Sequence, residues 1–371
     1  MGGKEQYYVN EAFETNWVAP LGPNVDGFES DLADFLGENS KVAALSTGTA
    51  AIHLGLILLG VKAGDEVLCQ SMTFSASANP ISYLGAIPIF VGSETETWNM
   101  SPVLLENAIN DRLAKGKKPK AIIPVHLYGM PAKMSEIIEI ARKYEIPVLE
   151  DAAEALGSNI NGQMCGTFGD ISILSFNGNK IITTSGGGAL VSSNKDYVNK
   201  ARYLATQARE ETPHYQHSEI GYNYRMSNIC AGIGRGQMEV LNERIKQRRA
   251  IYKTYFNRLS ELPGIKFLSE PSGYFSNRWL TTIIIEPRES GEITRETLRL
   301  ALQAENIEAR PLWKPMHLQP VFQGAPAYIN GTSDKLFENG LCLPSGSNLS
   351  SQDIERVFEV VERVWEKSTA K

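Results

Sequence analysis

Residues 121–150 read AIIPVHLYGMPAKMSEIIEIARKYEIPVLE, and this stretch decides the fold. It opens with the β-branched run 121–125 and closes with the apolar run 147–150, both typical of buried strands. Between the two runs, apolar side chains recur three and four positions apart, as on one face of a helix: Met134, Ile137, Ile138, Ala141 and Tyr144. A strand, a helix and a second strand in this order predict two parallel strands joined by a crossover helix.

The same alternation continues on both sides of this unit. Further strands are predicted at 42–45, 66–69, 87–91, 171–174 and 189–191. Strands that alternate with helices indicate an α/β protein with a largely parallel sheet, covered by helices on both faces.

The pattern changes after about Gln237. A long helical stretch extends to about Leu262, where Pro263-Gly264 ends it. A strand at 279–285 and helices at 294–305 and 351–366 follow. We therefore predict a large α/β domain over residues 1–245, with an N-terminal arm at 1–24, and a smaller C-terminal α+β domain over 246–371.

Composition excludes several classes of protein. The chain has 371 residues and a net charge of -6, whereas a nucleic-acid-binding face is basic. The longest apolar stretch, 50–61, is shorter than the ~20 residues of a membrane span. Four scattered cysteines, with no C-x-x-C pair, suggest neither a metal site nor disulfides. We expect a cytoplasmic protein without a nucleic-acid or membrane partner.

Two short motifs carry candidate binding residues. Ser46-Thr47-Gly48-Thr49-Ala50-Ala51 follows a predicted strand and opens a helix, where backbone N–H groups and the helix dipole favour an anion such as phosphate. An ordinary helix N-cap is the alternative. Glu150-Asp151-Ala152-Ala153-Glu154-Ala155 follows an apolar strand, at the end of the sheet where α/β proteins bind ligands. Asp151 there either holds a cationic group or caps a helix.

The most informative segment is 175–188, SFNGNKIITTSGGG, between two predicted strands. Lys180 is flanked by small residues, and partial burial would disfavour its ammonium form and leave an amine able to form a Schiff base. Most single lysines in loops are merely solvated. However, Asp151 lies upstream across one strand, and the ring of Phe74 follows another strand and could stack on a flat cofactor. Pyridoxal 5′-phosphate (PLP) requires a Schiff-base lysine and an acidic partner for its pyridine nitrogen.

With these motifs, the chain resembles the DegT/DnrJ/EryC1/StrS family of PLP-dependent sugar aminotransferases over nearly its whole length. The resemblance also rests on further motifs: WVAPLGP at 17–23, VHLYG at 125–129, GYNYRM at 221–226 and PMHLQP at 315–320. It implies fold type I, the architecture of aspartate aminotransferase. The segment 177–188 is most similar to enzymes that act at C4 of UDP-4-keto-6-deoxy-N-acetylglucosamine, with L-glutamate as the amino donor.

The resemblance also implies roles for individual residues. Lys180 would carry PLP as a Schiff base and move protons, and Asp151 would pair with the pyridine nitrogen. Glu154 occupies a position near the cofactor where relatives have Gln, His or Glu, and Phe74 would stack on the ring.

The phosphate of PLP would be held by Gly48, Thr49 and Ser175, joined by Asn223 from a partner subunit. A homodimer with shared active sites is therefore expected. We further expect three side chains to contact the substrate: His317, Trp17 and Arg225.

Several readings stay open at this point. His53 is expected in the core or at a dimer contact, whereas His126 could be structural or could face the cofactor. His317 lies in a proline-rich loop, and its sugar contact is one of two equal alternatives. The first rival function is a PLP-dependent keto-deoxysugar dehydratase, although relatives with that chemistry replace the lysine by histidine. The second is a non-catalytic small-molecule-binding regulator of the same fold.

Overall fold

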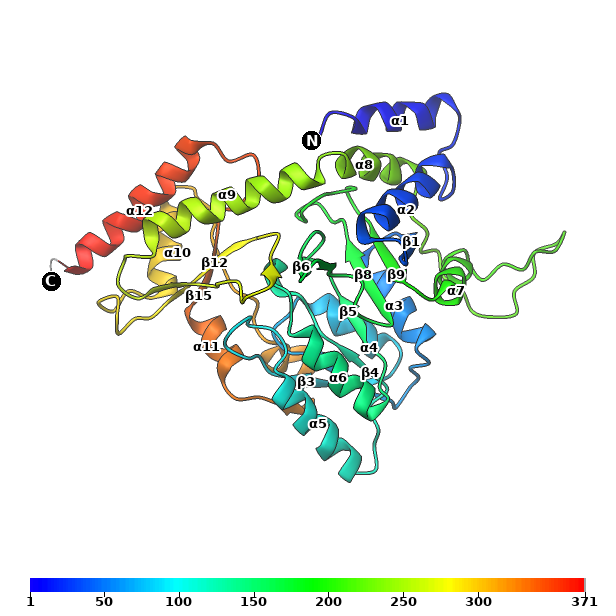
Figure 1. Cartoon of the computed structure of the whole chain (residues 1–371), viewed down its shortest axis with the longest axis horizontal. Coiled ribbons are helices and arrows are strands. Elements are labelled where there is room, and N and C mark those ends of the chain that lie inside the picture. The colour runs from blue at the N-terminus through cyan, green and yellow to red at the C-terminus, as the bar shows by residue number, and fades with distance from the viewer. Residues whose placement is uncertain (370–371) are drawn as a thin grey trace.

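A largely parallel sheet forms the centre of the molecule. The computed structural model describes residues 1–369, and Figure 1 shows the arrangement of its elements. The strands of the central sheet are β1 (Lys41–Leu45), β2 (Glu66–Gln70), β3 (Ile87–Val91), β4 (Ala121–Ile123), β5 (Leu149–Asp151), β8 (Ile171–Ser175), β9 (Gly188–Ser192) and β14 (Ala327–Tyr328).

Hydrogen bonds join these strands in the orders β1-β9-β8-β5 and β4-β2-β3-β14. Single parallel bridges, Ile122 to Val148 and Val125 to Asp151, place β4 beside β5. Only β9 runs against its neighbours, antiparallel to both β1 and β8. The predicted α/β fold with a largely parallel sheet is therefore confirmed, and the loop that carries Lys180 connects a parallel strand, β8, to the antiparallel one.

Helices of the first two thirds of the chain pack around this sheet, with α1 lying outside them on α8: α1 (Glu5–Glu14), α2 (Pro23–Leu36), α3 (Gly48–Leu58), α4 (Asn79–Tyr83), α5 (Pro102–Ala114), α6 (Met134–Tyr144), α7 (Lys195–Ala205) and α8 (Asn228–Met238). The periodicity at 134–144 correctly predicted α6. Its apolar face, including Ile137 and Ala141, is buried against the sheet.

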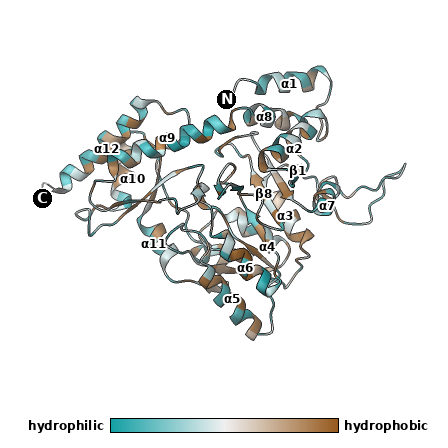
Figure 2. Cartoon of the chain, in the orientation of Figure 1, coloured by the Kyte–Doolittle hydropathy of each residue, from teal (hydrophilic) through white to brown (hydrophobic). Residues whose placement is uncertain are grey.

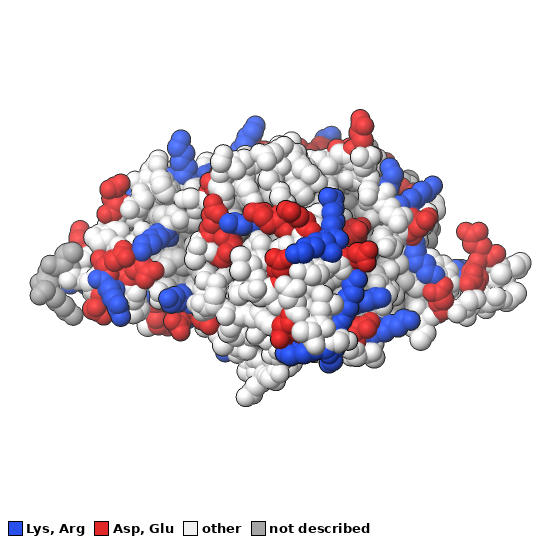
Figure 3. All heavy atoms as spheres, turned by 60° about the horizontal axis from the view of Figure 1, so that its bottom comes forward, with Lys and Arg blue, Asp and Glu red and all other residues white. Residues whose placement is uncertain are grey.

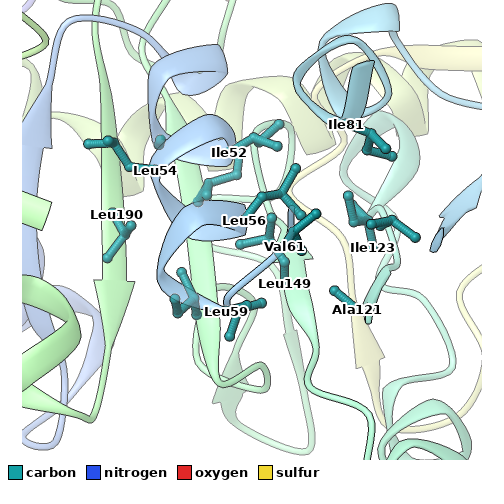
Figure 4. Packing of buried hydrophobic residues seen from close by; sticks show 14 of the residues in the cluster. Ile52, Leu54, Leu56, Leu59, Val61, Ile81, Ala121, Ile123, Leu149 and Leu190 are labelled. Carbon is teal, nitrogen blue, oxygen red and sulfur yellow. The ribbon is translucent and has the colours of Figure 1, made fainter. Parts of the chain in front are cut away.

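Helix α3 is the most deeply buried of these helices. It is apolar around nearly its whole circumference, as expected of a helix inside a core, and Figure 2 shows it mostly brown. Ile52, Leu54 and Leu56 pack among strands of the sheet, and Figure 4 shows them beside Leu149 and Leu190. This packing fixes the N-terminus of α3 at the carboxyl ends of the neighbouring strands.

His53 lies on α3 and is buried. Its Nδ1 lies 3.2 Å from the hydroxyl of Tyr224, and its ring meets that of Tyr222 edge-on. Burial lowers the pKa of His53, which favours the neutral ring.

A second sheet forms a separate core near the C-terminus. Its order is β10 (Ile265–Phe267), β12 (Thr281–Ile285), β15 (Gly340–Leu343) and β13 (Arg310–Pro311), and all pairs are antiparallel. The helices of this region are α9 (Leu241–Leu259), α10 (Arg295–Ala304), α11 (Thr332–Asn339) and α12 (Ser351–Thr369). In Figure 1 the long helix α9 extends from beside α8 to this second core.

The chain then returns from the second core to the central sheet. The backbone N–H of Met316 donates to the carbonyl of Ser71, and β14 pairs in parallel with β3. A small sheet of β11 (Tyr274–Phe275), β6 (Asn159–Ile160) and β7 (Gln163–Met164) forms a further link between the two halves. The division at residue 245 stays a prediction.

Two surface properties bear on partners. On the face shown in Figure 3, basic and acidic side chains lie interspersed. Among residues 1–369, no helix combines the length and apolar character needed to cross a bilayer.

Candidate active site

A cavity of about 240 Å³ opens where the carboxyl ends of β5 and β8 meet the N-terminus of α3. It is far larger than the ~10–15 Å³ that a water molecule requires. Most of the predicted cofactor-binding residues line it: Gly48, Thr49, Phe74, Asp151, Glu154, Ser175 and Lys180. Segments far apart in the sequence thus converge at the end of the sheet where α/β proteins bind ligands.

Asp151 is the last residue of β5 and is almost completely buried. Its Oδ2 accepts a hydrogen bond of 2.7 Å from the Ser77 hydroxyl, and its Oδ1 accepts one of 3.1 Å from the N–H of Ala153. Burial nevertheless raises the pKa of the Asp151 carboxyl, because these neutral donors only partly replace water. A cation at this position would stabilise the ionised form.

Lys180 extends from the loop between β8 and β9 into the same cavity. Its side chain is only 11% exposed, and its Nζ lies 3.4 Å from Oε1 of Glu154. On another side, Nζ lies 4.2 Å from the centre of the Trp279 ring. The amine is therefore held at the cavity wall between a carboxylate and an aromatic face.

Glu154 is oriented by an unusual backbone conformation. Its Oε2 accepts a hydrogen bond of 2.7 Å from the N–H of Tyr128, a residue in the left-handed region with φ 56°. Only a small fraction of non-glycine residues adopt this conformation, and they often occur at functional sites. Burial raises the pKa of Glu154, and the charge of Lys180 opposes that effect.

The opposite side of the cavity can bind an anion. Thr47 caps α3, with its hydroxyl accepting from the N–H of Ala50, so the free N–H groups of the first turn lie beside Gly48 and Thr49. Ser175, at the end of β8, adds a hydroxyl. A Cβ on Gly188 would lie 2.4 Å from the backbone nitrogen of Gly48, so β9 and α3 approach this closely only because Gly188 has no side chain.

Aromatic rings form one wall. Phe74, half-exposed at the cavity, lies 5.4 Å from the ring of Trp313. Trp313 stacks on Tyr128 at 6.2 Å, and Tyr128 stacks in turn on Trp279 at 6.4 Å. The Tyr128 hydroxyl also accepts from the N–H of Trp313 at 2.7 Å. Phe74, Trp313 and Trp279 line the cavity, and the buried Tyr128 ring lies between the two indoles and supports this apolar wall.

Glu150, the residue before Asp151 on β5, links this strand to neighbouring segments through a buried hydrogen-bond network. It is fully buried and accepts hydrogen bonds from His126 Nε2 at 2.8 Å, from the Ser172 hydroxyl and from three backbone N–H groups at 166, 168 and 169. His126 Nδ1 accepts from the N–H of Ala132, so Nε2 carries the proton. Burial would raise the pKa of Glu150, but this set of donors, with His126 foremost, lowers it. His126 is therefore structural and does not line the cavity.

A group of possible metal ligands includes this pair. Glu150, His126 and Cys165 offer ligand atoms within 4.8 Å of one another. The carboxylate oxygens already accept five hydrogen bonds, and burial raises the pKa of the Cys165 thiol, which keeps it protonated. The hydrogen-bond network thus accounts for the cluster, and we assign no metal to it.

The remaining predicted residues lie outside the lining of this cavity. Asn223 is exposed, and Trp17 is 40% exposed on the N-terminal arm. Arg225 is engaged by Oε1 of Glu29 at 2.6 Å and by the carbonyl of Ala44. His317 lies between the Ser71 hydroxyl at 2.7 Å and Asp334 Oδ1 at 2.9 Å. Within one chain, these four side chains do not join the site.

Sequence reasoning missed several residues of the cavity, and three of them make clear contacts there. Ser77 holds Asp151 in place, and Trp279 and Trp313 contribute to the aromatic wall. Ser77 carried no motif signal. Trp313 lies beside the proline-rich loop of His317, and the sequence predicts Trp279 as the first residue of a strand, although β12 begins at Thr281.

Comparisons with known proteins fit this geometry. The model of the DegT/DnrJ/EryC1/StrS aminotransferase family matches residues 1–362. A Bacillus subtilis (strain 168) protein, EpsN, named as a pyridoxal phosphate-dependent aminotransferase, is 52% identical over 97% of this chain and 93% of its own. GDP-perosamine synthase from Escherichia coli O157:H7 is 37% identical over 98% and 96%. The crystal structure of a family member from Brucella abortus superposes with a TM-score of 0.90 at 30% identity, covering 97% of this chain and 95% of that one.

The protein is a PLP-dependent aminotransferase of fold type I. It belongs to the DegT/DnrJ/EryC1/StrS aminotransferase family, as the sequence resemblance implied.

The residues of the cavity fit PLP. The first turn of α3 and Ser175 offer donors for a phosphate. Two buried carboxyls, Asp151 and Glu154, face a single ammonium, Lys180, so a protonated pyridine nitrogen near Asp151 would supply the missing positive charge.

We predict that Asp151→Asn and Glu150→Gln change the stability of the cofactor-free protein in opposite directions at pH 7. A carboxyl whose pKa is raised by folding destabilises the folded state once it ionises, so Asp151→Asn should raise the melting temperature by a few degrees. Glu150 has a lowered pKa and contributes stability above its ordinary pKa of about 4.3, which is lost as the pH falls. Glu150→Gln should cost about 3 kcal/mol, because several buried donors lose their charged acceptor.

Thermal unfolding of both variants and the wild type, followed by circular dichroism, measures these shifts. With the cofactor bound, Asp151→Asn should lower kcat at least ~100-fold. A fall in melting temperature for Asp151→Asn, or no change for Glu150→Gln, would contradict the electrostatic assignment.

Proposed function

We propose that this enzyme transfers the amino group of L-glutamate to C4 of a nucleotide-linked 4-keto-6-deoxy sugar, giving a 4-amino-4,6-dideoxy sugar nucleotide. UDP-4-keto-6-deoxy-N-acetylglucosamine is the substrate that we propose, for surface polysaccharide or glycan biosynthesis. The observation that carries the proposal is the meeting of Lys180, Asp151 and an anion-binding helix N-terminus in one cavity, in a chain of the sugar aminotransferase type.

When bound, PLP stores the electron pair released at a substrate carbon and carries the amino group between the two substrates. Every other function falls to side chains of the chain. Asp151 keeps a positive charge on the ring nitrogen, and the N-terminus of α3 holds the phosphate. Lys180 would hold the cofactor covalently through its amine and, once that amine is free, would act as the base that takes the proton from the donor's Cα. In the second half of the reaction, Lys180 delivers a proton to the sugar carbon.

The position of Lys180 suits this proton transfer. Its Nζ has Glu154 Oε1 on one side at 3.4 Å, and this carboxylate stabilises the ammonium that forms when Lys180 takes a proton. The wall of the cavity beside Lys180 includes the rings of Trp279 and Trp313. A mostly apolar wall limits the competition of water for that proton.

The alternatives differ in specific residues. A keto-deoxysugar dehydratase of this fold would have histidine in place of Lys180, and a non-catalytic regulator would not need the lysine beside two buried carboxyls.

The base of the substrate nucleotide is a separate question from the type of reaction. Relatives named GDP-perosamine synthase, at 34–37% identity, favour a GDP-linked sugar as the second candidate substrate.

We predict that the purified protein is yellow and that borohydride fixes the cofactor on Lys180. The modified peptide, identified by mass spectrometry, should contain residue 180. Lys180→Ala should lose turnover and the visible band yet still bind pyridoxamine phosphate, because Asp151 and the first turn of α3 provide the other contacts. Labelling of a different lysine would overturn the assignment.

The substrate is tested with a panel of sugar nucleotides. The holoenzyme, with L-glutamate, should aminate UDP-4-keto-6-deoxy-N-acetylglucosamine, and mass spectrometry and NMR of the product should place the new amine at C4. The matched GDP-linked 4-keto-6-deoxy sugar and a UDP sugar without the keto group serve as controls. Preference for the GDP-linked compound by about tenfold or more in kcat/KM would replace our proposed substrate with the second candidate.

We further propose a homodimer with shared active sites. Asn223 lies outside the cavity of its own chain and is exposed, next to a protruding segment in which Tyr215 is 76% and Ile220 84% exposed. Figure 1 shows this segment extending from the body of the molecule after α7. Large exposed apolar side chains favour burial against another chain. Asn223 would then reach the cofactor phosphate in the partner's cavity.

A subunit-mixing experiment tests the shared site. Lys180→Ala and Asn223→Ala homodimers should each be weak or inactive. In a mixed dimer one site carries both substitutions and the other carries neither, so exchange should restore activity up to about half per mixed dimer. No recovery, with exchange verified by differently tagged chains, would place Asn223 outside the partner's site.

A further inference from the structure

Trp279 connects the second core to the lysine of the active site. It belongs to the buried segment Ser276–Trp279, which precedes β12, and its side chain is only 1% exposed. Its indole contacts the lysine loop twice. Nε1 donates a hydrogen bond of 2.7 Å to the carbonyl of Asn179, the residue before Lys180, and the ring centre lies 4.2 Å from Lys180 Nζ.

These two contacts act on different parts of the lysine. The hydrogen bond fixes the backbone immediately before Lys180, in a loop whose preceding residues 177–179 are exposed. The aromatic face attracts the side-chain amine when it is an ammonium, because the ring carries negative charge on its face. Glu154 Oε1, 3.4 Å from the same Nζ, adds a second attraction. The free lysine therefore has one defined resting position.

Trp279 is itself firmly held. Its N–H donates to Asn277 Oδ1 at 2.8 Å, and its carbonyl accepts from Arg248 of α9 at 2.8 Å. The amide of Asn277 donates to the carbonyls of Glu154 and Leu156, each at 3.0 Å. The same short segment thus binds the loop that follows Asp151 and the loop that carries Lys180, and sets their separation.

We propose that Trp279 is a positioning residue for Lys180. The indole N–H places the lysine backbone, and the ring face holds the released amine within reach of the cofactor between proton transfers. When Lys180 takes the proton from Cα of the amino donor, the new ammonium lies between the Trp279 ring and Glu154. Lys180 would then deliver that proton to the cofactor carbon and not back to Cα, so that the amino group stays on the cofactor. This inference rests on the proposed role of Lys180.

Two substitutions separate the two contacts. Trp279→Phe keeps an aromatic face and removes the indole N–H, whereas Trp279→Leu removes both. The measurement is the rate at which L-glutamate bleaches the visible band of the holoenzyme in a single turnover. We expect the maximal rate to fall about tenfold for Trp279→Phe and further for Trp279→Leu, with the glutamate concentration at half-maximal rate within about twofold of wild type.

Trp365→Phe provides a matched control. Trp365 is also buried, and its indole N–H donates to the carbonyl of Pro263 at 3.0 Å, within the second core and away from the cavity. Its substitution should lower the melting temperature about as much as Trp279→Phe while leaving the bleaching rate unchanged. If Trp279→Leu does not fold, Trp279→Phe decides the question alone.

Two results would overturn the inference: bleaching at the wild-type rate in the Trp279 variants, or equal slowing in Trp365→Phe. Failure of the proposed function is recognised separately, because borohydride would then fail to label Lys180 in the wild-type protein. If Lys180 is labelled and the Trp279 variants react normally, only the positioning role is lost.

Discussion

Two buried carboxyls that share one ammonium are the constraint around which the rest of the site is built. Asp151 and Glu154 both lie within the protein, and Lys180 is the cation that opposes their charge. Removing charges from water is costly unless they are paired, so this arrangement is poorly balanced in the protein alone. A cofactor with a positively charged ring nitrogen beside Asp151 would complete it. The shortage of positive charge in the site would therefore favour the binding of such a cofactor.

A third buried carboxyl, that of Glu150, differs from these two because its charge is balanced within the protein. Glu150 is one residue from Asp151 on the same strand, yet its charge is fully satisfied by His126, Ser172 and the backbone of the turn at 166–169. Alternation along a strand sends neighbouring side chains to opposite faces. One face of β5 thus carries a carboxylate whose hydrogen bonds stabilise the fold, and the other face carries a carboxyl that lines the cavity.

Local sequence patterns were sufficient for most of the framework. The i, i+3, i+4 spacing predicted α6 at Met134–Tyr144, and apolar runs predicted the strands of the central sheet. The long helix expected from about Gln237 instead begins at Leu241, because α8 ends at Met238 before a short break. The motifs also brought the cavity-lining residues Asp151, Lys180 and Gly48 to attention.

What the sequence did not reveal depends on contacts across long separations. Ser77 reaches Asp151 over 74 positions, and the Trp279 indole reaches Asn179 over 100. No periodicity marks such pairs, because each residue looks locally like an ordinary loop or strand residue. His126 could not be assigned for the same reason: its partner, Glu150, is defined only once β4 and β5 lie side by side.

The return of the chain to the central sheet also matters for folding. Strand β14 is contributed by residues 327–328, yet it covers the outer edge of β3, a strand formed more than 200 positions earlier. Until the C-terminal third has been synthesised and has packed, β3 presents unpaired backbone groups, as does any open sheet edge. An incomplete or cleaved chain would thus expose a β-strand able to pair with other molecules. By covering this edge of β3, the C-terminal part of the chain protects the N-terminal part from aggregation.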